Sequence, residues 1–452
     1  MSEEAREEQP FHALIHDVES FRIEFVHGVR TPERLEQAEQ RLRERLDACR
    51  AAIGTVYQHF AAEGISVGLV FRLRQVRTRI VRVRQLLSCL TSAHPEQEAA
   101  RLLAGFVSVG RDRRSLRHLL ATNSSLLAAK VTERSAETGE HYISHNRSEY
   151  LQMVRRAAGG GLLMSVTTLL KFGLAALAFS AFWGGFWAGV NYSISFVLIQ
   201  LLHWTVATKQ PAMTAPAMAA KLKDMQSSED AAHTLEAFVD EVANLVRTQV
   251  AAILGNVLVV FPAALILSLL WWQLFGATPL DAAHAQSTLD SLHVLGPSAL
   301  FAAYTGVLLF ASSLIAGWVE NWFVLRRLDS AIRYNPRFTR WLGKGRAKRW
   351  GDFWRANISG FAANISLGMM LGLTPAIAAF FGLGLEVRHV TLSSGQLGVA
   401  SATFGLGVLA LPAFWWALAL LPLNGALNVI VSFYLAFRMA LRAHNINGVE
   451  RS

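Results

Sequence analysis

Long uninterrupted runs of apolar residues after residue 158 constrain the fold of this chain more than any other feature. A helix needs about 20 mostly apolar residues to cross the ~30 Å hydrocarbon core of a bilayer. Charged residues make up only 17% of the chain, whereas soluble domains carry about 25%. The sequence therefore predicts an all-α protein whose residues 151–443 form a polytopic membrane helical bundle. The runs that reach the required length, about six, are 159–180, 182–205, 250–272, 297–323, 357–381 and 413–437.

The loops between these runs alternate between basic and non-basic. Several Lys and Arg stand in the loops at 207–249 and 324–356 and near the C-terminus, whereas the loop at 276–296 has none. Short cytoplasmic loops hold the excess of Lys and Arg in membrane proteins. We therefore expect about six spans in a bacterial inner membrane, with a cytoplasmic N-terminus and a cytoplasmic tail at 444–452.

The stretch 391–411 (TLSSGQLGVASATFGLGVLAL) is ambiguous. It is rich in Gly, Ser and Thr and is followed by Pro412. A seventh span here would push the basic tail outside the cell, against the distribution of Lys and Arg. We therefore expect a re-entrant segment, an interfacial segment or a packed half-helix.

Residues 1–150 read as a cytoplasmic, basic α-helical domain. Residues 32–50 and 70–90 predict two amphipathic helices, the first opened by Pro32. Residues 97–130 predict a third helix and leave room for a fourth. The apolar stripe of the second helix comprises Leu73, Val76, Ile80, Val83 and Leu87.

Metal and disulfide signals are weak in this domain. Cys49 and Cys89 are the two cysteines of the chain, and they form neither a disulfide framework nor a zinc pattern, which fits a reducing compartment. His141 and His145 stand four residues apart, as two metal ligands on one helix face would. The other reading is a polar linker that enters the first span. We expect no metal and no cofactor.

Two clusters of arginines give the domain a basic surface. They can be a solvated helix face, a contact for anionic lipid headgroups at about 1 kcal/mol per basic residue, or a non-specific contact for nucleic-acid phosphates. Spacing does not separate the two kinds of contact, because both need only positive charge. The clusters consist of Arg72, Arg74, Arg77, Arg79, Arg82, Arg84, Arg111, Arg113, Arg114 and Arg117.

Polar side chains inside the predicted spans form a second candidate site. Lys171 falls near the middle of 159–180, where a charge costs about 2.5 kcal/mol or more. We therefore expect its ammonium to face the bundle interior and to meet polar groups of other spans. Such residues either join helices by hydrogen bonds or line a path for a substrate or protons. The candidates are Lys171, Asn191, Gln200, His203, Asn256, Glu320 and Asn364.

Two pairs of glycines recur at a spacing of four residues. Gly185 and Gly189 stand in the second run, and Gly368 and Gly372 in the fifth. Small residues at this spacing allow two helices to approach closely. We read them as packing positions.

Several strings resemble those of a known family. They are TGEHYI at 138–143, RRAAGGG at 155–161, LLHWTVATKQPAMTAPAMA at 201–219, VAAILGNVLVVFP at 250–262 and NWFVLRRLDSAI at 321–332. Through these motifs the chain is similar to the bacterial membrane-protein family labelled "site-specific recombinase", of the gonococcal Gcr type. Members are usually longer at the N-terminus, so the chain resembles a short form. The resemblance implies a role in DNA rearrangement.

The residues themselves do not form a recombinase active site. A tyrosine recombinase surrounds the scissile phosphate with a Tyr nucleophile and Arg, His or Lys side chains. The one HxxR string, from His27 to Arg30, has too few residues before it for the expected catalytic domain. A serine recombinase needs an α/β domain, and residues 1–150 show no strand pattern. Neither a Walker-type loop nor a nucleotide fingerprint is present.

Three functional hypotheses remain open. The first is the DNA role that the family label names, without strand-cleavage chemistry in this chain. The second is a transporter or channel for a small molecule or ion, favoured by Lys171, by Pro262 and Pro375 within spans, and by the 391–411 stretch. The third is a membrane scaffold or regulator that binds lipid or a cytosolic partner through its basic helices.

Overall fold

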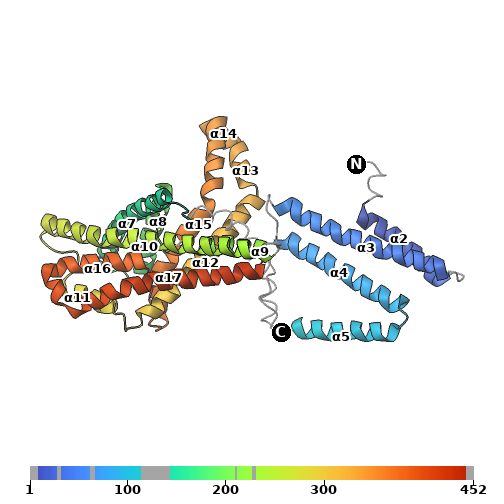
Figure 1. The fold of residues 1–452 in the computed structure, drawn as a ribbon. Coiled ribbons are helices and arrows are strands. Elements are labelled where there is room, and N and C mark those ends of the chain that lie inside the picture. The colour runs from blue at the N-terminus through green and yellow to red at the C-terminus, as the bar shows by residue number, and fades with distance from the viewer. Residues whose placement is uncertain are drawn as a thin grey trace. The chain divides into compact units, whose positions relative to one another are not determined.

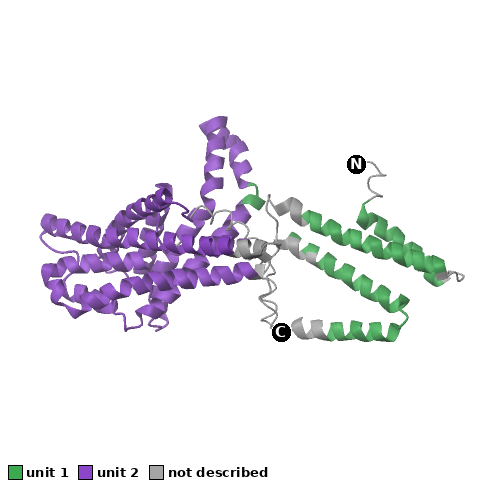
Figure 2. Cartoon of the chain, viewed as in Figure 1, with its two compact units in different colours: residues 1–127, 324–327 green, residues 128–323, 328–452 purple. Residues whose placement is uncertain are grey.

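Every regular element in the described part of the chain is a helix (Figure 1). It divides into two compact units (Figure 2), one of residues 1–127 with 324–327 and one of residues 128–323 with 328–452. The predicted all-α class is confirmed. The computed structural model describes residues 9–27, 32–61, 67–113, 143–208, 211–226 and 231–443.

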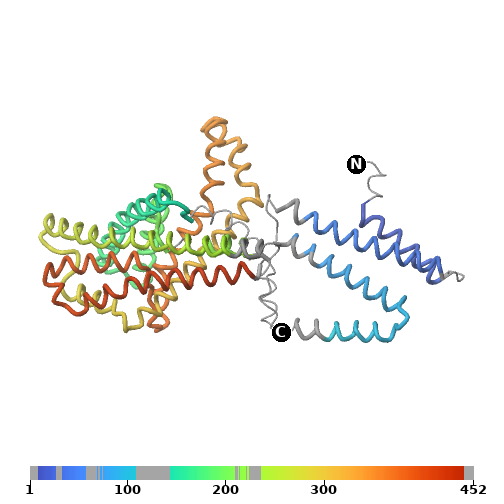
Figure 3. Tube along the Cα trace, viewed as in Figure 1, coloured from blue at the N-terminus to red at the C-terminus, as the bar shows by residue number. Residues whose placement is uncertain are grey.

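Four helices make up the described part of the first unit. The predicted helices at 32–50 and 70–90 are both present and longer than expected, and the first begins at Pro32. The remainder of 97–130 beyond Arg113 lies outside the described residues. A further helix precedes Pro32. The helices, traced in order in Figure 3, are α2 (Pro10–His27), α3 (Pro32–Ala61), α4 (Val67–Thr91) and α5 (Pro95–Arg113).

The core of this unit joins α2, α3 and α4. Leu46 and Cys49 on α3 are fully buried, and Leu87 on α4 packs with them. Of the predicted α4 stripe, Ile80 is also buried in this core, Leu73 and Val76 pack against it, and Val83 is 38% exposed.

The described part of the second unit contains the apolar helices. α7 packs along α10, α8 along α15, and α16 against α7, α10, α11 and α17. Its elements are α7 (Arg147–Ala176), α8 (Ala181–Leu201), α9 (Pro211–Gln226), α10 (Ala231–Phe275), α11 (Ala282–Ser291), α12 (Ser298–Leu325), α13 (Leu328–Tyr334), α14 (Pro336–Leu342), α15 (Lys344–Phe380), α16 (Val390–Phe404), η2 (Gly405–Ala410) and α17 (Pro412–Ala443).

Among the residues that the structure describes, seven helices are long and apolar enough to cross a membrane. Six of them, α7, α8, α10, α12, α15 and α17, correspond to the predicted runs, so the polytopic bundle is confirmed. The seventh combines α16 with η2, in the stretch for which we did not expect a full span. α16 alone has 15 residues and rises only about 22 Å. Its position relative to the bilayer stays a prediction.

Contacts along the bundle give the direction of each long helix. α16 runs parallel to α10, because Thr391 contacts Asn256 (3.4 Å) at its start and Gly398 packs against Phe261 further on. Corresponding contacts place α7, α10, α15 and α16 in one direction, and α8, α12 and α17 in the other. The start of α7 and the end of α17 therefore lie at the same end of the bundle.

The parallel arrangement of α15 and α16 requires an unusual connection. Consecutive parallel helices must be joined by a segment that returns the chain along the bundle. Residues 381–389 do this without helical structure, and α16 then runs back towards the end at which α15 finished. Nearly every residue of α16 is buried, and its small side chains permit this central position. The hairpin of 381–389 and α16 defines the site described next.

Candidate functional site

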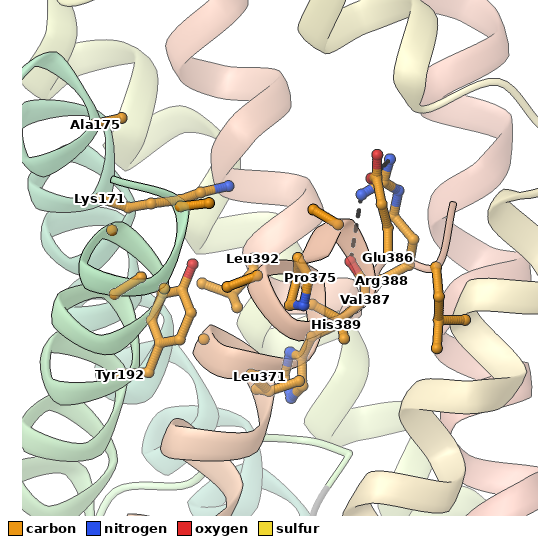
Figure 4. Close-up of a pocket in the computed structure, with 18 of the residues that line it drawn as sticks. Lys171, Ala175, Tyr192, Leu371, Pro375, Glu386, Val387, Arg388, His389 and Leu392 are labelled. Atoms are coloured by element: carbon orange, nitrogen blue, oxygen red, sulfur yellow. Dashed lines mark hydrogen bonds and ion pairs between the residues drawn. The ribbon is translucent and has the colours of Figure 1, made fainter. Parts of the chain in front are cut away.

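A cavity of about 720 Å³ lies between α7, α8, α15 and the returning segment (Figure 4). Pockets for small molecules usually measure about 300–1,000 Å³. Its wall is mainly apolar, with side chains such as Leu371, Pro375 and Leu392. The polar residues that line it are Lys171, Ser180, Tyr192, Glu386, Arg388, His389, Ser393 and Gln396.

The returning segment is held in place by polar side chains of other helices. The Arg388 backbone N–H donates to the Thr305 hydroxyl (2.8 Å). The Asn428 amide donates to the Arg388 carbonyl (3.0 Å) and accepts from the Val390 N–H (3.1 Å). Non-helical backbone at membrane depth is tolerated only where protein satisfies its polar groups. These bonds therefore make the segment a fixed wall of the cavity.

The charges on the wall do not balance. The Arg388 guanidinium pairs with Glu386 (2.6 Å) and donates to the Ser291 carbonyl (3.0 Å). The Lys171 ammonium has no hydrogen-bond or ion-pair partner among the described residues, and it lies 5.3 Å from the centre of the Phe172 ring. In Figure 4 it points from α7 across the cavity towards the returning segment. One positive charge is therefore left for a ligand.

His389 forms the inner end of the cavity. Its side chain is 1% exposed, and Nε2 lies 2.8 Å from the Thr208 hydroxyl. Its Nδ1 is buried and has no partner within the described chain. His389 also precedes the first turn of α16, whose N–H groups lack partners within the helix and carry the positive end of its dipole. The Val390 N–H is taken by Asn428, but Lys171 and the positive end of the α16 dipole together suit a ligand with an anionic group.

Lys171 lies nearer the end of its helix than its sequence position suggested. α7 ends at Ala176, so Lys171 stands five residues, or about 7.5 Å, from the end of its helix. The apolar run 159–180 included residues beyond this end, and α7 starts twelve residues before the run, at Arg147. None of the polar residues of other spans that we expected as partners contacts the Lys171 ammonium by a hydrogen bond or an ion pair.

Two of those residues join α8 to its neighbours. The Asn191 amide donates to the Thr167 carbonyl on α7 (2.9 Å). The Gln200 carbonyl oxygen accepts from Asn364 (2.5 Å), and its NH₂ donates to Asn357 (3.2 Å), both on α15. Both residues form interhelical hydrogen bonds, and neither lines the cavity.

Asn256 is the most connected of the predicted residues. Its buried NH₂ donates to the carbonyls of Ala157 and of Thr205 (3.0 Å). Its carbonyl oxygen accepts from the Ala207 N–H (2.8 Å). One side chain thus ties α7, α10 and the loop after α8 together.

The last two predicted polar residues lie at helix ends. α8 stops at Leu201, so His203 stands in the following turn, exposed and with φ of 57°, rather than within a span as predicted. Glu320 lies 3.5 Å from Arg355 in an ion pair near the end of α12. Neither residue lines the cavity.

The sequence did not single out Tyr192, Arg388 or His389. A charged pair, Glu386 and Arg388, directly before a stretch of small polar residues was the available signal. Charges in a short loop normally read as solvated, and only the return of the chain into the bundle brings Arg388 inside, where it is 7% exposed.

The arginines of the first unit have mixed environments. The Arg82 guanidinium lies 4.1 Å from the centre of the Phe106 ring, and Arg84 pairs with Asp47. Arg72, Arg77 and Arg79 are exposed. The side chains of the other predicted arginines lie outside the described structure, namely Arg74, Arg111, Arg113, Arg114 and Arg117.

The described residues contain no group of three His, Cys, Asp or Glu that could hold a metal ion. His145 instead lies 3.0 Å from Glu241, a buried carboxylate that also accepts from Lys221 (2.5 Å). His141 lies outside the described residues.

Comparison with known proteins gives one match. The family model described as "Site-specific recombinase" matches residues 1–452, the whole sequence. Neither a curated protein nor a solved structure matches the chain. The resemblance carried by the motifs is therefore confirmed, and the chain belongs to the site-specific recombinase family.

Proposed function

We propose that the membrane unit binds a small, partly apolar anion in the cavity between α7, α8, α15 and the returning segment. The observation that carries this proposal is the Lys171 ammonium, which faces a cavity of about 720 Å³ and has no partner among the described residues. An unpaired charge in an apolar setting is costly. A bound anion would remove that cost, while the apolar wall would accept a hydrocarbon portion.

The surroundings of Lys171 support a binding site in a transport pathway. Transporters commonly bind substrates where a discontinuous helix meets non-helical backbone, with a helix N-terminus aimed at an anionic group. The segment 381–389 followed by α16 has this form. The distribution of Lys and Arg supports a position of the cavity on the outer side of the bundle. We infer that the ligand enters from there.

Binding of chemically matched amphiphiles tests the proposal. Purified protein in detergent is titrated with octanoate, octyl phosphate, octanol and octylamine, and unfolding temperature is the readout. We expect saturable stabilisation by the two anions only. Lys171→Met should weaken anion binding about tenfold or more, the loss of roughly 1.4 kcal/mol.

The control variant is Arg247→Met, which removes an exposed charge on α10 outside the cavity. It should bind the anions as the parent protein does. Equal stabilisation by octanol and octanoate, or unchanged anion binding in Lys171→Met, would contradict the proposal.

The family description favours a second candidate function in DNA rearrangement. Strand cleavage by a tyrosine recombinase would require a nucleophile among several cations. In the described chain, the Tyr434 hydroxyl accepts from one arginine, Arg438 (3.3 Å), and Tyr334 is hydrogen-bonded to one arginine, Arg333. We infer that a DNA role of this protein is indirect, through charge contacts of the exposed α4 arginines.

Covalent trapping separates the two kinds of DNA role. Purified protein incubated with DNA and denatured should give no protein–DNA adduct, and any DNA binding should weaken steeply with salt. An adduct on any Tyr or Ser would refute an indirect role.

A further inference from the structure

The segment between α12 and the apolar part of α15 forms a basic hairpin, which we define as residues 328–356. It contains α13, α14 and the first turns of α15. Arg333 pairs with Asp352 (2.6 Å), and Gly351 packs against the Asp329 carbonyl, so the hairpin is held on α15. Figure 1 shows α13 and α14 standing out from the side of the bundle, across the direction of α10 and α17.

The charges of the basic hairpin are mostly unpaired. Its acidic residues are Asp329 and Asp352, and Asp352 is engaged by Arg333. Of the other cations, Arg355 pairs with Glu320 (3.5 Å). The rest are exposed, and none of their side chains has a hydrogen-bond or ion-pair partner among the residues that the structure describes. They are Arg337, Arg340, Lys344, Arg346, Lys348 and Arg349.

Large aromatic side chains stand among these cations. Tyr334 is 73% exposed, Phe338 40% and Trp341 90%. Trp341 lies at the end of α14, one residue before its last position. Exposed aromatics in such number mark an interaction surface. Aromatic rings next to Lys and Arg are typical of side chains that sit at the headgroup level of a bilayer.

We propose that the basic hairpin docks on the anionic phospholipid headgroups of the leaflet around the bundle. The cations would bind the lipid phosphates. The layer between headgroups and acyl chains would accommodate the rings of Tyr334, Phe338 and Trp341. α15 continues from the hairpin into the predicted span at 357–381, so Lys344 lies within about 20 Å of the start of that span. A nucleic acid would satisfy the cations, but it would not account for the position of the rings beside a membrane span.

A reporter beside the hairpin tests this docking with the full chain. Cys49 and Cys89 are changed to Ala, and Gly345→Cys carries an environment-sensitive fluorophore, because a side chain at Gly345 meets open space. The protein is placed in nanodiscs of phosphatidylcholine or of phosphatidylcholine with about 30% phosphatidylglycerol. Quenching is measured in each mixture by adding a doxyl-labelled lipid. We expect quenching by the doxyl lipid to be about twofold stronger with phosphatidylglycerol and to fall at high salt.

Two variants separate the contributions of rings and charges. Phe338→Ser with Trp341→Ser should abolish most of the quenching in both lipid mixtures. Replacing the six unpaired cations with Gln should abolish only the difference between mixtures. Quenching that is independent of phosphatidylglycerol and of Trp341 would overturn the proposal. So would protection of the fluorophore from aqueous iodide by DNA and not by lipid, which would identify nucleic acid as the partner instead.

Discussion

The backbone of Gly372 on α15 packs directly on that of Gly185 on α8, and a Cβ added to Gly372 would lie 2.5 Å from the Gly185 carbonyl oxygen. Gly368 approaches Ser193 on α8 in the same way. Gly372→Ala therefore forces the two helices apart. We expect a loss of about 1–3 kcal/mol in unfolding free energy, the usual effect of overpacking. Thermal unfolding in detergent measures it.

Gly173 on α7 provides the matched control, because a Cβ there meets nothing within 4 Å. Gly173→Ala should leave stability unchanged or raise it slightly, since Ala has the higher helix propensity. Equal stability of Gly372→Ala and Gly173→Ala would mean that the α8–α15 contact is not as close as described.

Asn256 gives a second stability prediction. Asn256→Leu leaves the Ala157 and Thr205 carbonyls and the Ala207 N–H without their side-chain partner. Each buried group left unsatisfied costs about 1–3 kcal/mol, although interhelical bonds in membranes measure nearer 0.6 kcal/mol on average. We expect a total loss of about 2 kcal/mol or more in chemical unfolding. Asn191→Leu removes one bond and should cost clearly less.

These two sites show what the sequence could predict. The spacing of Gly185, Gly189, Gly368 and Gly372 identified the helix faces that pack, because small residues act through a local pattern. The polar residue Asn256 was identified as buried because its run is otherwise apolar. Its partners could not be predicted, because they are backbone groups of other segments, whose positions depend on how the helices are packed.

Sequence patterns could not predict the cavity either, because it also depends on contacts between segments that are far apart in the chain. The alternation of basic loops argued against a full span at 391–411, but no periodicity describes a non-helical segment such as 381–389. Its path depends on hydrogen bonds from Thr305 and Asn428, which lie far from it in the chain. Lys171 was identified as a candidate, whereas its distance from the helix end was not, because hydropathy does not define where α7 ends.

The two cysteines should differ in reactivity. Cys49 is fully buried in the core of the first unit, and burial raises the pKa of its thiol, whereas Cys89 is partly exposed. Because the thiolate is the reacting species, we expect a soluble maleimide to label Cys49 at least about tenfold more slowly than Cys89.

The pH dependence of maleimide labelling gives a second test of the burial of Cys49. With a raised pKa, the thiolate fraction of Cys49 keeps increasing at pH values where an ordinary thiol, half ionised at about pH 8.5, is already fully ionised. Labelling of the Cys89→Ala variant, followed by mass spectrometry, isolates Cys49. Equal rates for the two thiols in the folded protein would contradict the described core.

Membrane orientation gives the last prediction. The direction of the helices places the start of α7 and the end of α17 at one end of the bundle, and the basic loops assign that end to the cytoplasm. In a protein without native cysteines, Ser287→Cys on α11 and Gly345→Cys on α15 introduce exposed thiols in loops that should face opposite sides. An impermeant maleimide should label Ser287→Cys in intact spheroplasts and Gly345→Cys only after permeabilisation. Both should react in detergent, which controls for access. Labelling of Gly345→Cys from outside would reverse the topology and would place the Lys171 cavity on the cytoplasmic side.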